Sequence, residues 1–188
     1  LEPIKAKSYE LGTRGELASW LYYELTVYRM EIEDDIVSIV DGFERNVYNA
    51  GETSHEGIEV ALNGSITEEW MYAIAFSKTR QEYENFSYTC CFPSQNIDVS
   101  GNEVGKAPET LGNVTLAYSP MALPNLRIEL EWEHIGEYYT DETNTATYEG
   151  YDLYNLRANY RVSDSLELYG RAQNLTDELY STYTSNQV

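Results

Sequence analysis

The stretch GYDLYNLRANYRVSDSLELYGRAQNLTDELY, residues 150–180, contains two runs in which apolar and polar side chains alternate, joined by the short polar turn 163–165. In the first run the intervening positions carry Asn or Arg, and the apolar positions are Tyr154, Leu156, Ala158, Tyr160 and Val162. Because successive side chains of a strand point to opposite faces, this pattern predicts a sheet with one apolar and one polar face. The apolar face then meets either a second sheet or lipid.

Composition narrows the class of protein. The chain has 188 residues and a formal net charge of -20, which argues against nucleic acid and anionic membrane surfaces as partners. No run approaches the roughly 20 apolar residues of a membrane helix. The sequence begins at Leu1, without an initiator Met or a signal peptide, so we expect a processed or cut N-terminus.

Strand length favours lipid over a second sheet. Six further runs alternate in the same way, namely residues 9–14, 20–31, 47–63, 69–81, 110–118 and 126–138. Most of these runs are as long as outer-membrane strands, which need about 9–11 residues to cross a tilted path. Strands of ordinary globular proteins average about 5–6 residues.

The connections between the runs alternate in length. Short connections fall at 15–19, 64–68, 119–125 and 163–165, and long ones at 32–45, 82–109 and 140–149. Short turns on one rim and long loops on the other are typical of a transmembrane β-barrel. Aromatic residues also gather near strand ends, as expected for rings at headgroup depth. The sequence therefore predicts an all-β fold, a segment of an antiparallel up-and-down transmembrane barrel with about eight strands.

Four motifs resemble the C-terminal half of TonB-dependent outer-membrane receptors. They are Ser8-Tyr-Glu-Leu-Gly12, Asn49-Ala-Gly51 followed by Gly57-Ile-Glu59, Pro108 at the start of a strand, and Asn174-Leu-Thr-Asp-Glu-Leu-Tyr180. The resemblance covers nearly the whole chain. It implies that residues 1–188 are part of one β-barrel domain of 22 strands, with the plug domain and the final strand absent from this sequence.

The same resemblance implies a function. Such a receptor actively takes up a scarce nutrient, by family default a ferric siderophore, with energy relayed by TonB through the absent N-terminal plug region. Its partners are then outer-membrane lipid, TonB and a small nutrient ligand, either a metal chelate or a glycan. The expected location is the bacterial outer membrane.

The sequence does not favour an enzyme, and it predicts no catalytic residue, metal site or cofactor. His55 and Glu56 do not form the His-Glu-x-x-His zinc motif, and no glycine-rich phosphate loop is present. The adjacent Cys90 and Cys91 lack the paired spacing of a zinc site, so we expect free thiols or partners outside this chain.

Candidate functional residues lie on the polar face and in the long loops. Charges cannot face hydrocarbon cheaply, so eleven residues are predicted to face a lumen: Glu10, Arg14, Glu24, Arg127, Glu129, Glu131, Glu133, Arg157, Arg161, Glu167 and Arg171. Aromatic rings with nearby polar groups suit a metal chelate or a glycan. The predicted ligand contacts are Phe86, Tyr88, Phe92, Tyr138, Tyr139 and Tyr148.

Two alternatives remain open at this stage. A self-contained eight-stranded outer-membrane barrel with a structural or adhesive role would close with side chains filling its interior. A soluble extracellular β-sandwich that binds glycans would bury the apolar face against a second sheet.

Overall fold

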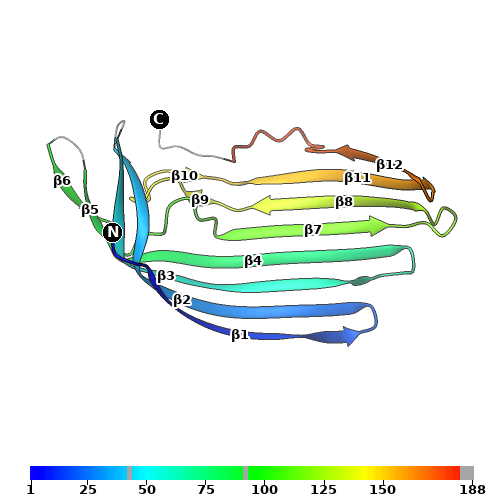
Figure 1. Ribbon diagram of the computed structural model, residues 1–188, viewed down its shortest axis with the longest axis horizontal. Helices are drawn as coiled ribbons and strands as arrows, with labels where there is room; N and C mark the ends of the chain where they lie inside the picture. Colours follow the sequence, from blue (N-terminus) through cyan, green and yellow to red (C-terminus); the bar gives the residue numbers. More distant parts are fainter. Residues whose placement is uncertain (42–43, 91–92, 183–188) are drawn as a thin grey trace.

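An antiparallel sheet of eight strands makes up most of the chain in a computed structural model, which describes residues 1–41, 44–90 and 93–182 (Figure 1). In spatial order its strands are β1 (Lys5–Ala18), β2 (Leu21–Asp41), β3 (Glu44–Ser65), β4 (Trp70–Asn85), β7 (Thr110–Tyr118), β8 (Leu126–Ile135), β11 (Tyr151–Ser163) and β12 (Leu166–Ala172). Four short strands lie in the loops: β5 (Ser87–Cys90), β6 (Gln95–Asp98), β9 (Tyr138–Tyr139) and β10 (Thr147–Tyr148). No helix of the length and hydropathy needed to span a membrane occurs among the described residues.

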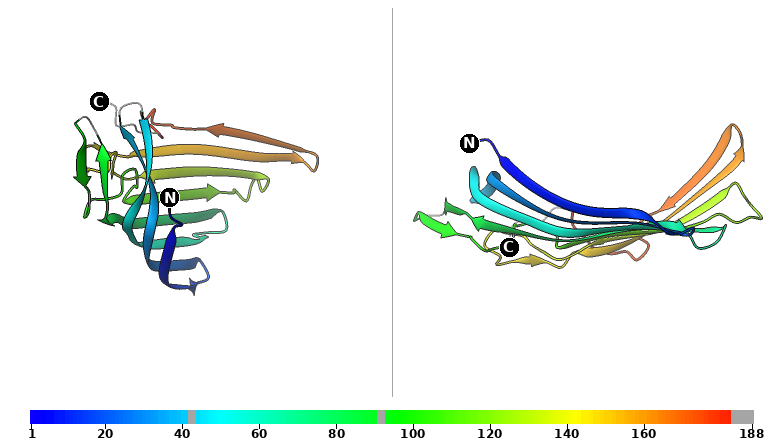
Figure 2. Two further views of the ribbon diagram at one scale, coloured as in Figure 1. Left: turned by 60° about the vertical axis from the view of Figure 1, so that its left-hand side comes forward. Right: turned by 90° about the horizontal axis from the view of Figure 1, so that it is seen from below.

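The topology agrees with the predicted meander. Each strand of the large sheet pairs with its neighbour in the chain once the loop hairpins are set aside, and the eight strands correspond to the eight predicted runs. The sheet is curved, with the short turns at one end and the long loops at the other (Figures 1 and 2). Strands β1 and β12 are its open edges, so these residues do not form a closed eight-stranded barrel.

The strand register sorts side chains onto two faces. One face, here called the apolar face, carries cross-strand rows such as Leu25, Val60 and Phe76. These three side chains remain partly or largely exposed, and no second sheet covers this face in the described part of the chain. The sandwich alternative is therefore not supported.

The apolar face ends abruptly along β2. On β2 its apolar positions run from Leu21 to Val27, about 20 Å along the strand at roughly 3.3 Å per residue, and Arg29 follows. Beyond this limit the strands stay paired, but the same face becomes charged. Arg29 forms an ion pair with Glu31 at 3.2 Å, and Arg80 forms one with Glu82 at 2.6 Å. The outer parts of β2, β3 and β4 thus stand beyond the apolar band.

The prediction of an irregular connection over residues 32–45 is wrong. Instead, β2 continues to Asp41 and β3 begins at Glu44, because hairpin pairing satisfies the backbone hydrogen bonds outside the apolar band. This hairpin bends away from the sheet (Figure 1) near Asp34, which has a φ of 60°. On β3, Gly51 lies so close to the carbonyl oxygen of Asn85 that a Cβ would overlap it.

The bent hairpin packs against the β5–β6 hairpin. Their contact encloses a hydrophobic core of Ile39, Tyr83, Phe86, Tyr88 and Val99. The Tyr48 hydroxyl donates a hydrogen bond across it to the carbonyl oxygen of Thr89, at 3.1 Å. We call residues 35–50 together with 83–99, within the described ranges, the outer body.

The expectation of a free thiol is wrong for Cys90, which is disulfide-bonded. Cys91 lies outside the described residues.

Candidate ligand-binding site

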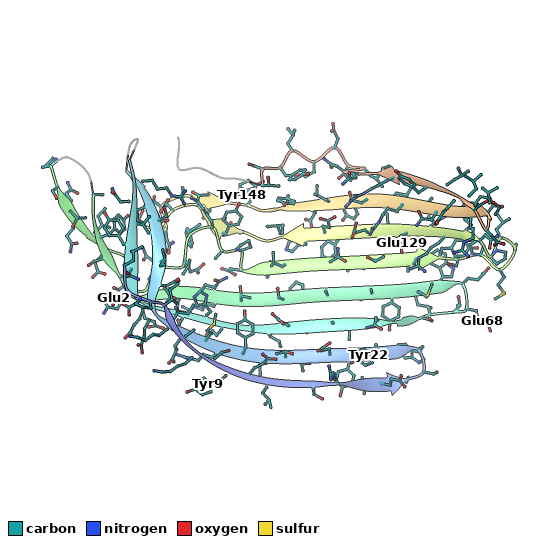
Figure 3. All side chains as sticks on the ribbon, viewed as in Figure 1. Glu2, Tyr9, Tyr22, Glu68, Glu129 and Tyr148 are labelled. Carbon is teal, nitrogen blue, oxygen red and sulfur yellow. The ribbon has the colours of Figure 1, made fainter. Side chains whose placement is uncertain are left out.

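The eleven predicted lumen residues share one face of the sheet, here called the polar face. The register sets Arg14 opposite Glu24 and, at the other end of the sheet, Arg161 opposite Glu167. Between them, Glu129 lies opposite Arg157. Figure 3 shows side chains along the whole length of these strands, with Glu129 and Tyr22 labelled.

A carboxylate ladder on β8 forms the most ordered part of the polar face. Arg157 bridges two of its steps, at 3.7 Å from Glu129 and 3.2 Å from Glu131. Arg127 binds Glu129 at 2.8 Å. The buried Asn155 donates to Glu133 at 2.6 Å, so the carboxylates of the ladder share donors from two strands.

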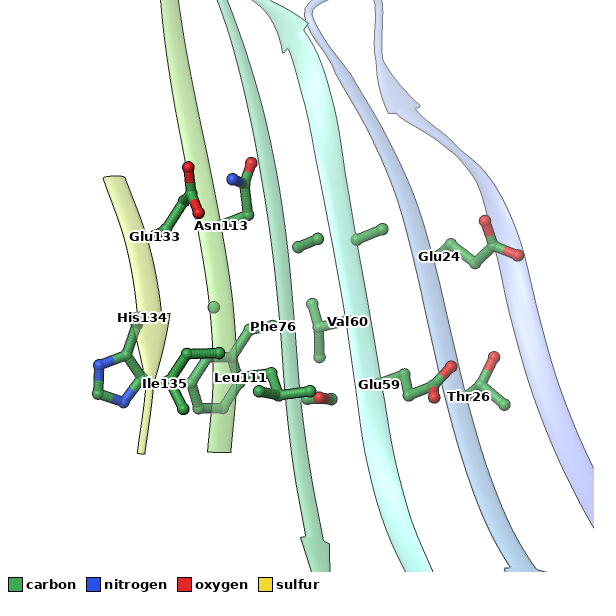
Figure 4. Close-up of a pocket in the computed structure, with 14 residues that line it drawn as sticks. Glu24, Thr26, Glu59, Val60, Phe76, Leu111, Asn113, Glu133, His134 and Ile135 are labelled. Carbon is green, nitrogen blue, oxygen red and sulfur yellow. The ribbon is translucent and has the colours of Figure 1, made fainter. Parts of the chain in front are cut away.

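Beside this ladder, small side chains leave a hollow of about 600 Å³ in the sheet face (Figure 4). One cross-strand row explains its shape: Glu24 on β2, Ala61 on β3, Ala75 on β4, Asn113 on β7 and Glu133 on β8. The two alanines form the floor, and carboxylates stand on both sides. Such a hollow can receive a polar or cationic group that projects from the lumen side.

A cluster of tyrosine rings lies at the long-loop end of the same face. Tyr138 and Tyr148, from the small β9–β10 hairpin, have ring centroids 5.3 Å apart. Tyr148 lies 6.5 Å from Tyr151, and Tyr151 lies 4.6 Å from Tyr180. Tyr151 belongs to the polar face, because the register sets it opposite Ile135, which lines the hollow. We call these four residues the tyrosine cluster.

The structure separates the six predicted ligand aromatics. Tyr138 and Tyr148 meet in the tyrosine cluster, and Tyr139 lies beside them on β9. Phe86 and Tyr88 instead fill the outer body, with exposed fractions of 2% and 7%. Phe92 lies outside the described residues.

Sequence reasoning missed Tyr151 and Tyr180 as members of a common site. In the sequence Tyr180 is only the last residue of a family motif, and Tyr151 is one of many aromatic residues near strand ends. Alternation places Tyr151 on the polar face, but nothing in the sequence shows that the chain after β12 returns to it. Figure 1 shows the chain after β12 continuing alongside β11 toward the long-loop end.

The loop that carries Tyr148 is ordered around Asp141. Its carboxylate accepts hydrogen bonds from the Thr143 hydroxyl, from the backbone and hydroxyl of Thr145 and from the Ala146 amide, at 2.8–3.0 Å. Burial works to raise the pKa of Asp141, but these hydrogen bonds outweigh it and hold the pKa below its ordinary value. The side chain of Asn144 joins this loop to the backbone of Glu103. It accepts a hydrogen bond from the Glu103 amide at 2.7 Å and donates one to the Glu103 carbonyl oxygen at 3.0 Å.

No cluster of three or more His, Cys, Asp or Glu side chains suited to a metal ion occurs within residues 1–41, 44–90 and 93–182. Both histidines have protein partners. His55 contacts Thr53 and Gln81, and His134 contacts Thr110 and Asp152.

A family model described as "TonB dependent receptor-like, beta-barrel" matches residues 1–175. The chain belongs to this family. Members of the family are transporters of the outer membrane of Gram-negative bacteria and not enzymes, and this chain is part of such an outer-membrane barrel.

Two curated relatives are siderophore receptors by name. The probable TonB-dependent siderophore receptor PiuA of Acinetobacter baumannii is 27% identical over 188 residues, covering 97% of this chain and 24% of the relative. The ferric-pyoverdine BN7/BN8 receptor of Pseudomonas putida is 25% identical over 183 residues, covering 96% and 20%. The chain thus spans about a quarter or less of the length of these relatives.

Solved structures share the fold. The crystal structure of PiuA from Acinetobacter baumannii superimposes with a TM-score of 0.73 at 25% identity, covering 92% of this chain and 24% of that one. The ferric yersiniabactin receptor FyuA of Yersinia pestis gives a TM-score of 0.72 at 19% identity, covering 93% and 25%. The second likeness concerns the fold alone.

Proposed function

We propose that residues 1–188 are part of the barrel domain of a receptor that takes up a ferric siderophore across the outer membrane, with energy relayed by TonB. The observation that carries the proposal is the family membership of the chain, together with the siderophore-receptor names of both curated relatives. In this reading the apolar face meets lipid and the polar face lines the lumen. The eleven charged residues of the polar face are then lumen residues.

The polar face offers a graded path for a solute. At the long-loop end the tyrosine cluster supplies flat rings with hydroxyl groups, which suit the apolar and polar parts of a metal chelate. Next along the strands comes the hollow, with Leu111 and Ile135 at the end nearer the long loops and the carboxylates Glu24 and Glu133 beyond them. The ladder of Glu129, Glu131 and Arg157 follows. The ligand would first contact the tyrosine cluster and then pass the hollow and the carboxylate ladder.

Among the predicted ligand aromatics, we retain Tyr138, Tyr139 and Tyr148 and add Tyr151 and Tyr180. Phe86 and Tyr88 support the outer body from within, so they act on the ligand only by holding that body in place. A metal chelate is preferred over a glycan because two curated relatives are named for siderophores or their ferric complexes.

The proposal is tested with the full-length receptor in a bacterial strain that lacks its other siderophore receptors. Cells are grown without free iron and supplied with one ferric complex at a time: a tricatecholate, a trihydroxamate and a pyoverdine. We expect growth and uptake of radioactive iron with at least one complex, and loss of both when tonB is deleted.

Uptake that persists without TonB would contradict the proposed energy source. Failure of all three complexes, with the receptor present in the outer membrane, would contradict siderophore uptake for this set. A strain carrying the empty vector is the control for uptake through other routes.

A further inference from the structure

The segment of residues 174–182 follows β12 but does not continue the sheet as a strand. β12 pairs with β11 only from Leu156 onward. In the described part of the chain, the residues of β11 before Leu156 therefore have no partner strand on that side. The segment takes that place as an irregular chain, which includes the left-handed residues Asn174 and Asp177, with φ of 52° and 54°. It runs back toward the long-loop end (Figure 1).

Three hydrogen bonds attach the segment to the site. The Asn174 amide donates to the side-chain oxygen of Asn155 at 3.0 Å, and the Leu175 amide donates to the carbonyl oxygen of Tyr154 at 2.8 Å. At the far end the Ser181 amide donates to the Tyr148 hydroxyl at 2.9 Å. The last contact ends directly on a ring of the tyrosine cluster.

The turn inside the segment is fixed by its first residue. The side chain of Asn174 accepts from the Glu178 amide at 2.8 Å and donates to the Glu178 carbonyl oxygen at 2.9 Å. Asn tolerates positive φ, and its side chain can hydrogen-bond nearby backbone groups. Asn174 therefore both turns the chain and closes the turn through its hydrogen bonds to Glu178. The turn leaves Tyr180 on Tyr151, whereas the neighbouring Leu179 is 95% exposed.

We infer that Tyr180 is a ligand-specificity residue of the tyrosine cluster, and that Asn155 and Asn174 are positioning residues that deliver its ring to Tyr151. Asn155 is 2% exposed and uses both ends of its amide: the oxygen receives the Asn174 amide and the nitrogen binds Glu133 of the ladder. The side chain of Asn155 therefore joins the segment to the carboxylate ladder. This inference rests on the proposed function, because it names a further part of the same site.

The test uses full-length receptor in detergent, titrated with the ferric tricatecholate, trihydroxamate and pyoverdine, with ligand binding followed by fluorescence quenching. For the complexes that bind, Tyr180→Ala and Asn174→Ala should weaken affinity about 2- to 10-fold, the equivalent of one aromatic contact. Tyr180→Phe should restore affinity, because the ring is kept. Leu179→Ala, in the same segment, and Tyr169→Ala, an exposed tyrosine of the polar face, should bind as the unmodified receptor does.

Unfolding midpoints separate a binding role from a structural one, since Tyr180→Ala should leave the midpoint unchanged. Asn155→Leu is a second variant and should behave as Asn174→Ala does if it still folds. If Tyr148→Ala and Tyr151→Ala weaken binding but Tyr180→Ala does not, this inference is overturned while the proposed site stands. If none of the three matters, or no complex binds, the proposed site or function fails with it.

Discussion

At the scale of single residues, Arg157 is the group on which the carboxylate ladder depends most. It lies opposite Arg171, and like charges directly across a strand pair repel. Arg157 is compensated by Glu129 and Glu131, whose side chains are only 18% and 14% exposed. Arg171 and Arg161 make no side-chain ion pair within the described residues.

Replacing Arg157 with Met should therefore destabilise the receptor by about 1–3 kcal/mol, the range for hydrogen bonds to charged groups that lose a partner. Arg161→Met removes the same charge from the same strand and should change stability by less than about 0.5 kcal/mol. Urea unfolding of both variants in lipid vesicles measures the difference. Equal effects would show that the ladder does not depend on Arg157.

Face assignment is the residue-scale property that the sequence predicts well. Alternation alone places Glu10, Glu129 and Arg171 on one face, since the side-chain period of a strand is fixed. The burial of side chains in loops follows no such period, so the sequence does not predict it. Phe86 and Tyr88 carry the same sequence signal as Tyr138, but only packing of two hairpins decides that they are internal.

At the scale of elements, we expect the bend in the β2–β3 hairpin to depend on the close backbone approach of Gly51 to Asn85. Gly51→Ala should displace the hairpin and loosen the outer body, because the added Cβ would overlap the Asn85 carbonyl oxygen. Gly170→Ala, with no atom within 4 Å of the new Cβ, is the matched control. Limited proteolysis of intact cells should cut the outer loops faster in the first variant only. Identical cleavage rates would argue against this origin of the bend.

The loop that carries Tyr148 should loosen in acid. The folded-state pKa of Asp141 is lowered, so its contribution to stability is present above its ordinary value of 3.8 and is lost as pH falls through the lower folded value. Amide exchange at Thr145 and Ala146, corrected for its intrinsic pH dependence, should show protection at pH 6 that is lost only when the pH falls below the ordinary value of 3.8. Asp141→Asn should remove much of this protection at pH 6. Protection that persists in acid would contradict the role of the carboxylate.

Sequence reasoning about elements succeeded within the apolar band and failed beyond it. Inside the band the alternation is strict, and strands such as β8 are found within a few residues of their predicted limits. Beyond Val27 the face of β2 that was apolar carries Arg29 and Glu31, whereas Met30 and Ile32 lie on the opposite face. This change of face obscures the strand pattern, although hairpin pairing continues to Asp41. Charged residues there indicate only that the chain has left the apolar band.

At the scale of the whole molecule, the proposed function requires one curved sheet with lipid on one face and an aqueous lumen on the other. The open edges β1 and β12 fit this requirement, because further strands of a larger barrel can pair with them. The relatives are roughly four to five times longer than this chain, as coverages of 24% and 20% imply.

The most direct test is the solvent exposure of each position along β2 in full-length receptor reconstituted into bilayers. Single spin labels from Leu21 to Glu33 are examined with oxygen, which partitions into lipid, and with a water-soluble nickel chelate. We predict that odd positions up to Val27 favour oxygen, that even positions favour nickel, and that all positions from Arg29 outward favour nickel. An absence of alternation, or oxygen accessibility that continues past Arg29, would contradict a lipid-facing wall with a water-filled interior.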